Sequence, residues 1–188
     1  MPEPKPKIHG VVLVDLQVFG DDRGFFVETY RRAWLPGSKE MIQGNRADRK
    51  AGSIVGLHYH LHQSDYWYVP FGSARAMLHD LRQGSPTFGV TEFFDLGQDI
   101  TQPERFNHYG LYIPQGIAHG FSALSDATIT YLVDGYYNPE DELGVAWNDP
   151  EIKADWGVTN PIVSERDQKN PLRKDIQPQL IPQFESRD

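Results

Sequence analysis

The chain is built from short segments rich in β-branched and aromatic residues, each followed by a turn signal containing Gly, Pro, Asn or Asp. The segments predicted as strands span residues 11–14, 25–30, 53–59, 66–71, 74–81, 90–96, 110–113 and 127–133. Short strands at this spacing are typical of a β-sandwich or barrel. Only residues 31–39 and 148–156 are compatible with short helices, and neither range has a sustained 3.6-residue period. The sequence therefore predicts an all-β fold.

One domain is the simplest organisation for a chain of 188 residues, which can fill one core but is short for two. Hydrophobic residues make up 39% and aromatic residues 12% of the chain, which excludes a disordered protein. We expect a single domain over residues 1–188 with a frayed, Pro- and Lys-rich N-terminus at 1–7. From about residue 170 to 188 a polar, Pro-rich tail is expected to wrap the surface or to contact a partner subunit.

Charge and cysteine content exclude several classes of protein. The formal net charge of -8, without a long run of Lys and Arg, argues against nucleic acid as a partner. The absence of Cys excludes disulfides, thiolate nucleophiles and Cys-based zinc sites, and fits a reducing compartment. No apolar run approaches 18 residues, so neither a membrane-spanning segment nor a secretion signal is evident. A cytoplasmic location is the resulting expectation.

Three histidines alternate in the segment GSIVGLHYHLHQSD, residues 52–65. On a strand, a period of two places His58, His60 and His62 on one face. If that face is the inside of a barrel, the three side chains converge on one cavity. If it faces solvent, they are ordinary surface residues.

The wider spacing of these residues resembles the two signature motifs of the cupin superfamily. The first motif covers His58, His60 and Asp65, and the second is Pro-x-Gly-x2-His, ending at His119. In metal-binding cupins these positions hold a divalent ion, so the resemblance offers a metal-dependent enzyme as an alternative function. Asp65 stands where cupins usually have Glu, and many relatives use the histidines without a metal.

A longer series of motifs runs from about residue 10 to 170. It comprises FGDDRGFFVE (19–28), QGN (43–45), GLHY (56–59), GSPTFG (84–89), IPQGIAHGF (113–121), YYNP (136–139), WND (147–149) and SERD (164–167). In this order and spacing the motifs resemble the dTDP-4-dehydrorhamnose 3,5-epimerase family. The resemblance implies a homodimeric, cupin-type jelly roll that acts on a dTDP-linked keto-deoxy sugar. It would invert one or two carbons beside the C4 ketone of the nucleotide-linked 6-deoxyhexulose, without a cofactor.

The resemblance also implies roles for individual residues. His58 matches the general base, Asp167 matches the carboxylate that orients it, and Tyr131 matches the proton donor on the opposite face of the sugar. A carboxylate on one ring nitrogen fixes the tautomer of a histidine and raises the basicity of the other nitrogen. Without the family, Tyr131 would be taken for a core or rim aromatic residue.

Further positions match the family's substrate-binding residues, and they are Arg23, Glu28, Gln43, Asn45, His119, Tyr137, Glu142 and Arg166. Tyr137 matches the aromatic residue that stacks on the thymine ring. Arginine suits a diphosphate because its planar fork donates paired hydrogen bonds and keeps its charge. Taken alone, Arg23 is equally well explained as a turn residue that pairs with Asp21 or Asp22.

Four positions depart from the family pattern. Val55 stands where the family usually has Arg, and His60 stands where it usually has Gln. Asp65 takes the place of the Lys that polarises the ketone oxygen, and Ala76 takes the place of an inward carboxylate. A carboxylate at position 65 would repel a developing oxyanion. The departures leave four interpretations open: a changed substrate, a single-carbon epimerase, a sugar-nucleotide-binding protein without activity, or a metal that takes over the role of the Lys.

Overall fold

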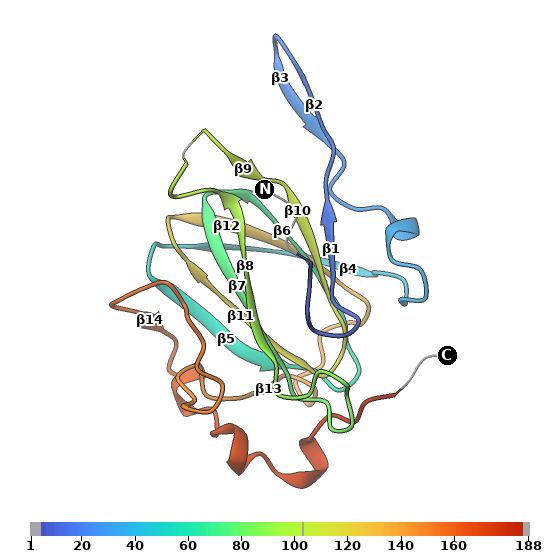
Figure 1. Cartoon of the computed structure of the whole chain (residues 1–188), viewed down its shortest axis with the longest axis vertical. Coiled ribbons are helices and arrows are strands. Elements are labelled where there is room, and N and C mark those ends of the chain that lie inside the picture. Colours follow the sequence, from blue (N-terminus) through green and yellow to red (C-terminus); the bar gives the residue numbers. More distant parts are fainter. Residues whose placement is uncertain (1–4, 103, 186–188) are drawn as a thin grey trace.

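The computed structural model describes residues 5–102 and 104–185, and strands dominate it (Figure 1). A five-stranded sheet has the order β1 (Val12–Asp15), β10 (Tyr109–Ile113), β6 (Asp65–Phe71), β12 (Ala127–Val133) and β4 (Gln43–Arg49). A seven-stranded sheet has the order β13 (Leu143–Gly144), β5 (Ser53–Tyr59), β11 (Ile117–Ala123), β7 (Ser73–Asp80), β8 (Thr91–Gln98) and β9 (Phe106–Asn107), and β14 (Ile162–Val163) pairs with β5. The predicted all-β jelly roll is confirmed.

The main core lies between these two sheets. Along β7, Ala76 and Leu78 belong to the cluster between the sheets, whereas Met77 belongs to a second cluster on the outer face. This alternation follows from the two-residue period of a strand. It explains why β7 is apolar on both faces, since each face is covered.

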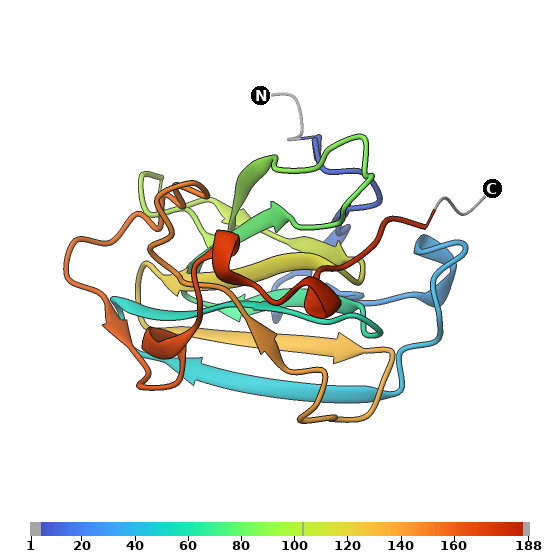
Figure 2. The same ribbon diagram turned by 90° about the horizontal axis from the view of Figure 1, so that it is seen from below.

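The chain after β12 covers the outer face of the seven-stranded sheet. There Ile54, Leu57 and Met77 of the sheet form a cluster with Trp156 and Ile176. Figure 2 shows this C-terminal segment, drawn in orange to red, passing in front of the strands. The described part of the predicted tail therefore lies on the protein's own surface.

The two predicted helical ranges contain very little helix. Residues 31–39 hold one 3₁₀ turn, Arg32–Trp34, and residues 148–156 hold only turns. In the second range Asp149 accepts hydrogen bonds from the backbone N–H groups of Glu151 and Ile152 at 2.7 and 3.1 Å. The left-handed φ of 54° at Lys153 then ends the turn. Three more 3₁₀ turns lie in the C-terminal segment, at Asp167–Lys169, Arg173–Asp175 and Pro178–Leu180.

The N-terminus is attached to the body within the range predicted to fray. The backbone N–H groups of Lys7 and Ile8 each donate to the Glu92 carboxylate at 2.9 Å, and Ile8 is buried. Residues 1–4 of that range, and residues 186–188 of the predicted tail, lie outside the described residues. In the part of the chain that is described, no helix is long and apolar enough to cross a membrane.

A two-stranded hairpin projects away from both sheets. It consists of β2 (Val18–Asp21) and β3 (Gly24–Val27), and Figure 1 shows it extending from the top of the body. Its aromatic side chains Phe19, Phe25 and Phe26 are 55%, 63% and 67% exposed. Large exposed apolar side chains gathered in one place indicate a contact surface.

Candidate active site

A cavity of about 100 Å³ lies between the two sheets. The five-stranded sheet and its edges line it with Ala47, Arg49, Asp65, Trp67 and Tyr131, the seven-stranded sheet with Val55, His58, His119, Gly120 and Phe121, and the connecting loops with His60, Gln63 and Glu142. Four of the predicted site residues therefore line one cavity: His58, His119, Tyr131 and Glu142.

His58 forms a short hydrogen bond with Asp167 at the edge of this cavity. Nε2 of His58 lies 2.6 Å from Oδ1 of Asp167, whose side chain is 4% exposed. The other carboxylate oxygen accepts the backbone N–H of Gly56 at 3.2 Å. Burial alone would raise the pKa of Asp167, but the hydrogen bonds from His58 and Gly56 hold it below its ordinary value. Asp167 is therefore a carboxylate at neutral pH, and the neutral His58 ring carries its lone pair on Nδ1.

Two glycines allow the strand that carries His58 to lie close to β11. A Cβ at Gly56, whose φ is 111°, would come within 2.8 Å of Gly120 Cα, and a Cβ at Gly120 would come within 2.4 Å of the Val55 carbonyl oxygen. Only glycine fits at both positions. In the resulting register His58 pairs with His119, so that both side chains face the same cavity.

Tyr131 enters the cavity from the opposite sheet. It lies on β12 between Asn45 of β4 and Trp67 of β6. Burial raises the pKa of its phenol, and the negative charges of Asp65 and Glu142 raise it further. The hydroxyl is therefore protonated at neutral pH and available as a proton donor.

His60, Asp65 and His119 gather at one end of the cavity and are buried. Nδ1 of His60 lies 2.8 Å from the Asp141 carbonyl oxygen, and Nδ1 of His119 lies 2.9 Å from that of Ile117. Because only an N–H can bond to a carbonyl oxygen, the lone pair of each neutral ring is on Nε2. Desolvation by burial lowers the pKa of His119 to about 4, so this ring is neutral at pH 7.

His62 does not join the other two histidines. Strand β5 ends at Tyr59, and the chain then turns, so the strand alternation stops before position 62. His62 is exposed, and its carbonyl oxygen accepts a hydrogen bond from Lys39 Nζ at 3.0 Å. The expectation that the three histidines share one face is wrong for His62.

Three of the predicted binding residues lie beside the cavity. Gln43 and Asn45 are on the face of β4 that also carries Ala47 and Arg49, and Gln43 Nε2 donates to Asn45 Oδ1 at 3.0 Å. The backbone N–H of Tyr137 donates to Gln43 Oε1 at 3.3 Å, and the Tyr137 side chain is 65% exposed. A polar strip therefore leads from the cavity to an exposed aromatic ring.

The remaining predicted binding residues are held in ion pairs at the surface. Arg166 contacts Glu142 at the cavity wall, with Nη2 to Oε2 at 3.3 Å. Arg23 pairs with Asp21 within the projecting hairpin, as the turn interpretation expects, and its side chain is 89% exposed. Glu28, just after the hairpin, pairs with Arg31. Neither Arg23 nor Glu28 lines the cavity of its own chain.

The sequence interpretation missed Arg49, Gln63 and Trp67 as cavity residues. Arg49 shares the cavity lining with Val55, the position at which the resemblance described above leads us to expect an arginine. The two-residue period that links Arg49 to Gln43 and Asn45 was the available signal, because all three lie on one face of a strand.

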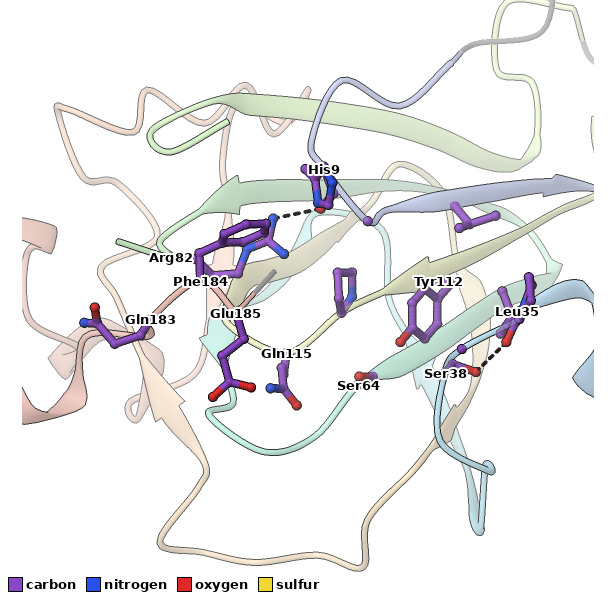
Figure 3. A pocket seen from close by; sticks show the side chains of 15 residues that line it. His9, Leu35, Ser38, Ser64, Arg82, Tyr112, Gln115, Gln183, Phe184 and Glu185 are labelled. Carbon is purple, nitrogen blue, oxygen red and sulfur yellow. Dashed lines mark hydrogen bonds between the residues drawn. The ribbon is translucent and has the colours of Figure 1, made fainter. Parts of the chain in front are cut away.

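A second and larger cavity, of about 440 Å³, lies between the N-terminal and C-terminal segments (Figure 3). Arg82 donates there to the His9 carbonyl oxygen at 2.7 Å, and Phe184 packs nearby. Its lining includes none of the proposed acid/base residues. The smaller cavity is the better candidate site because a paired base and a protonated phenol meet there.

Comparison with known proteins identifies the family of this chain. The family model for dTDP-4-dehydrorhamnose 3,5-epimerase matches residues 5–175. Proteins of that name from Neisseria gonorrhoeae and Pseudomonas aeruginosa are 38% and 37% identical over 164 and 170 residues, covering 84% and 86% of this chain. The chain spans about half of the first relative (48%) and 90% of the second.

A solved structure has the same fold. The dTDP-6-deoxy-D-glucose-3,5-epimerase of Legionella pneumophila, in complex with dTDP-4-keto-L-rhamnose, superimposes with a TM-score of 0.86 at 30% identity, covering 96% of this chain and 97% of that one. The family match covers far more than half of the sequence. The chain belongs to the dTDP-4-dehydrorhamnose 3,5-epimerase family.

Proposed function

We propose that this protein epimerises a dTDP-linked 4-keto-6-deoxyhexose, converting dTDP-4-dehydro-6-deoxyglucose to dTDP-4-dehydrorhamnose. The observation that carries this proposal is the His58–Asp167 pair on one side of a buried cavity and the protonated Tyr131 on the other. The two groups come from facing sheets. A base and an acid on opposite sides of a sugar ring are what inversion at carbon requires.

His58 acts as the base. Its Nδ1 removes a proton from a carbon beside the ketone, where the developing enolate makes the C–H acidic. The resulting imidazolium is stabilised by the Asp167 carboxylate at 2.6 Å. Asp167 contributes by orienting the ring and by its charge.

Tyr131 returns a proton from the other face. A proton returned by His58 would restore the starting configuration, so the second proton must come from a different group. The raised pKa of Tyr131 keeps its hydroxyl protonated at the moment of transfer. Inversion then follows from the positions of the two residues in opposite sheets.

The nucleotide is proposed to bind along β4. Gln43 and Asn45 supply hydrogen-bonding groups on the strip that ends at the exposed Tyr137 ring, which suits stacking on thymine. Val55 is apolar, so the guanidinium that binds the diphosphate is supplied instead by Arg49, which lines the same cavity. Arg166 and Glu142 close the other rim.

A second copy of the chain is proposed to complete the site. Arg23 and Glu28 do not line the cavity of their own chain, and they are carried on or beside a projecting hairpin with three exposed Phe side chains. In a two-fold dimer this hairpin would bury its Phe side chains and place Arg23 near the diphosphate of the other subunit.

Hydrogen exchange tests the proposed reaction. In deuterated water with dTDP-4-keto-6-deoxyglucose, NMR should show loss of the C3 and C5 hydrogen signals, and His58→Ala should abolish it. The control is His62→Ala, an exposed histidine outside the cavity. A folded protein that binds the nucleotide sugar without any exchange would refute the epimerase.

Mixed dimers test the shared site. Arg23→Ala and His58→Ala chains are each expected to be inactive alone. If Arg23 serves the partner's site, a random mixture should recover about a quarter of the activity, because half of the dimers are mixed and each has one intact site. If dimers shown to be mixed recover no activity, Arg23 does not serve the partner's site.

A further inference from the structure

The cavity holds a buried carboxylate beside two imidazoles. His60, Asp65 and His119 are 5%, 4% and 6% exposed, and each can bring one ligand atom within 4.8 Å of the others. Two of the three, His60 and Asp65, differ from the Gln and Lys that the resemblance to the family leads us to expect at these positions. The two departures therefore meet at one point in space.

Both imidazoles are oriented as metal ligands are. Each ring donates Nδ1–H to a backbone carbonyl, at 2.8 Å for His60 and 2.9 Å for His119, and presents the lone pair of Nε2. Histidines that bind metals nearly always have their second nitrogen fixed in this way.

Asp65 is held in place without a cation. Its Oδ1 accepts Gln63 Nε2 and its Oδ2 accepts Trp67 Nε1, both at 3.0 Å. Among the described residues, no Lys or Arg forms an ion pair with Asp65, and the nearest basic nitrogen recorded for it is His119 Nε2 at 3.8 Å. A buried carboxylate without a counter-charge is costly, so this arrangement favours a bound cation.

We propose that His60, Asp65 and His119 bind one divalent first-row transition-metal ion. Two imidazoles and one carboxylate suit iron, manganese, nickel or zinc, and three protein ligands leave positions open toward the cavity. Ligand atoms bonded to one ion at about 2.0–2.2 Å lie about 3–3.5 Å apart. Oδ2 of Asp65 and Nε2 of His119 are 3.8 Å apart, and the ligand atoms of all three residues lie within 4.8 Å of one another, so metal binding would draw the three side chains closer together.

This ion compensates for the absence of a lysine at position 65. Resting on the proposed function, we assign it the role of polarising the ketone oxygen of the substrate, which the family gives to that Lys. His58 stays outside the metal site because, of the residues that the structure describes, only His60, Asp65 and His119 bring ligand atoms within 4.8 Å of one another, and its Nε2 is bonded to Asp167 at 2.6 Å. The proposed reaction therefore keeps His58 as its base, and the metal ion takes the place of the lysine in polarising the ketone.

Metal binding can be tested without any substrate. Untagged protein freed of metal with a chelator should bind Co²⁺ and Zn²⁺ with a stoichiometry of one per chain, measured by visible Co²⁺ absorption and by calorimetry. His60→Gln and Asp65→Asn should each weaken metal binding at least about 100-fold. Losing a hydrogen-bond partner of a ligand can already cost about that much, and these variants replace a ligand itself. His62→Gln, two residues away and exposed, is the matched control and should bind normally.

Restoring the family residues provides a second test. The double variant His60→Gln, Asp65→Lys should lose metal binding, and any epimerase activity it has should resist chelation, whereas chelation should lower the exchange rate of the parent protein. Circular dichroism confirms that each variant is folded.

The outcomes separate the two proposals. Metal binding at these residues without exchange of any dTDP-keto sugar would leave the metal site standing and refute the epimerase. Exchange that a chelator does not alter, in protein that binds no metal, would refute the metal site and leave the epimerase standing.

Discussion

Asp167 lies 109 positions after His58 in the sequence, yet its carboxylate oxygen is 2.6 Å from the His58 ring. The contact depends on the C-terminal segment, which places the 3₁₀ turn Asp167–Lys169 against β5. The base of the proposed reaction is therefore assembled from a central strand and from the segment that covers its sheet.

Replacing Asp167 by Asn should lower the rate of hydrogen exchange by about 10²–10⁴-fold, the usual contribution of acid–base catalysis. The amide removes the charge that stabilises the His58 imidazolium. NMR exchange with dTDP-4-keto-6-deoxyglucose measures the rate. Asp175→Asn, an exposed carboxylate in the same segment, is the control. A rate within threefold or so of the parent's would exclude the pair as the base.

Replacing Tyr131 by Phe should separate exchange from inversion. His58 can still remove and return a proton on its own face, so deuterium should enter the sugar. Net epimerisation should fall by at least about 100-fold because the opposite face has lost its donor. NMR of the product sugar distinguishes the two effects. Tyr136→Phe, at an exposed neighbouring tyrosine, should leave both rates intact.

Replacing Arg49 by Gln should weaken dTDP binding by about 10- to 100-fold, because a charge-assisted hydrogen bond contributes about 1.5–3 kcal/mol. Calorimetry with dTDP measures this. Arg46→Gln is the matched control, since Arg46 lies on the other face of β4. Adding Val55→Arg, the family residue, should recover affinity. Equal affinity for the Arg46 and Arg49 variants would remove Arg49 from the site.

Replacing Asp80 by Ala should destabilise the fold by about 3–5 kcal/mol. Asp80 is fully buried and accepts Arg82 Nη2 and the Ser85 hydroxyl at 2.8 and 2.7 Å. Its loss leaves the Arg82 charge buried and unpaired. Urea unfolding measures the change. Lys50→Ala, which breaks an exposed pair with Asp126, should have little effect.

The same carboxylate makes stability depend on pH. Burial alone would raise the pKa of Asp80, but hydrogen bonds from Arg82, Ser85 and Thr87 hold it below the ordinary value. A lowered pKa stabilises the folded state above the unfolded pKa of about 3.9. This contribution should disappear as the pH falls through the lower folded pKa. Unfolding curves of the parent and Asp80→Ala should therefore converge in acid and differ fully at neutral pH.

Much of the fold could be predicted from local pattern. The predicted ranges 53–59 and 127–133 coincide with β5 and β12, because alternating apolar side chains and flanking turns are local properties. The local pattern does not predict strand β4, because Gln43–Arg49 is mostly polar. Strand β11 was missed because Ile117–Ala123 is buried on both faces and does not alternate.

The sequence by itself determined the all-β class, the family motifs and the residue types that acid–base chemistry needs. Only the tertiary structure decided that His60 turns inward and His62 outward, that Arg49 and Val55 line the same cavity, and that Arg23 does not line it. It alone brings together His60, Asp65 and His119. The reason is physical: strand periodicity orients neighbours along the chain, whereas the packing of two sheets and a covering segment sets the distances between residues far apart in it.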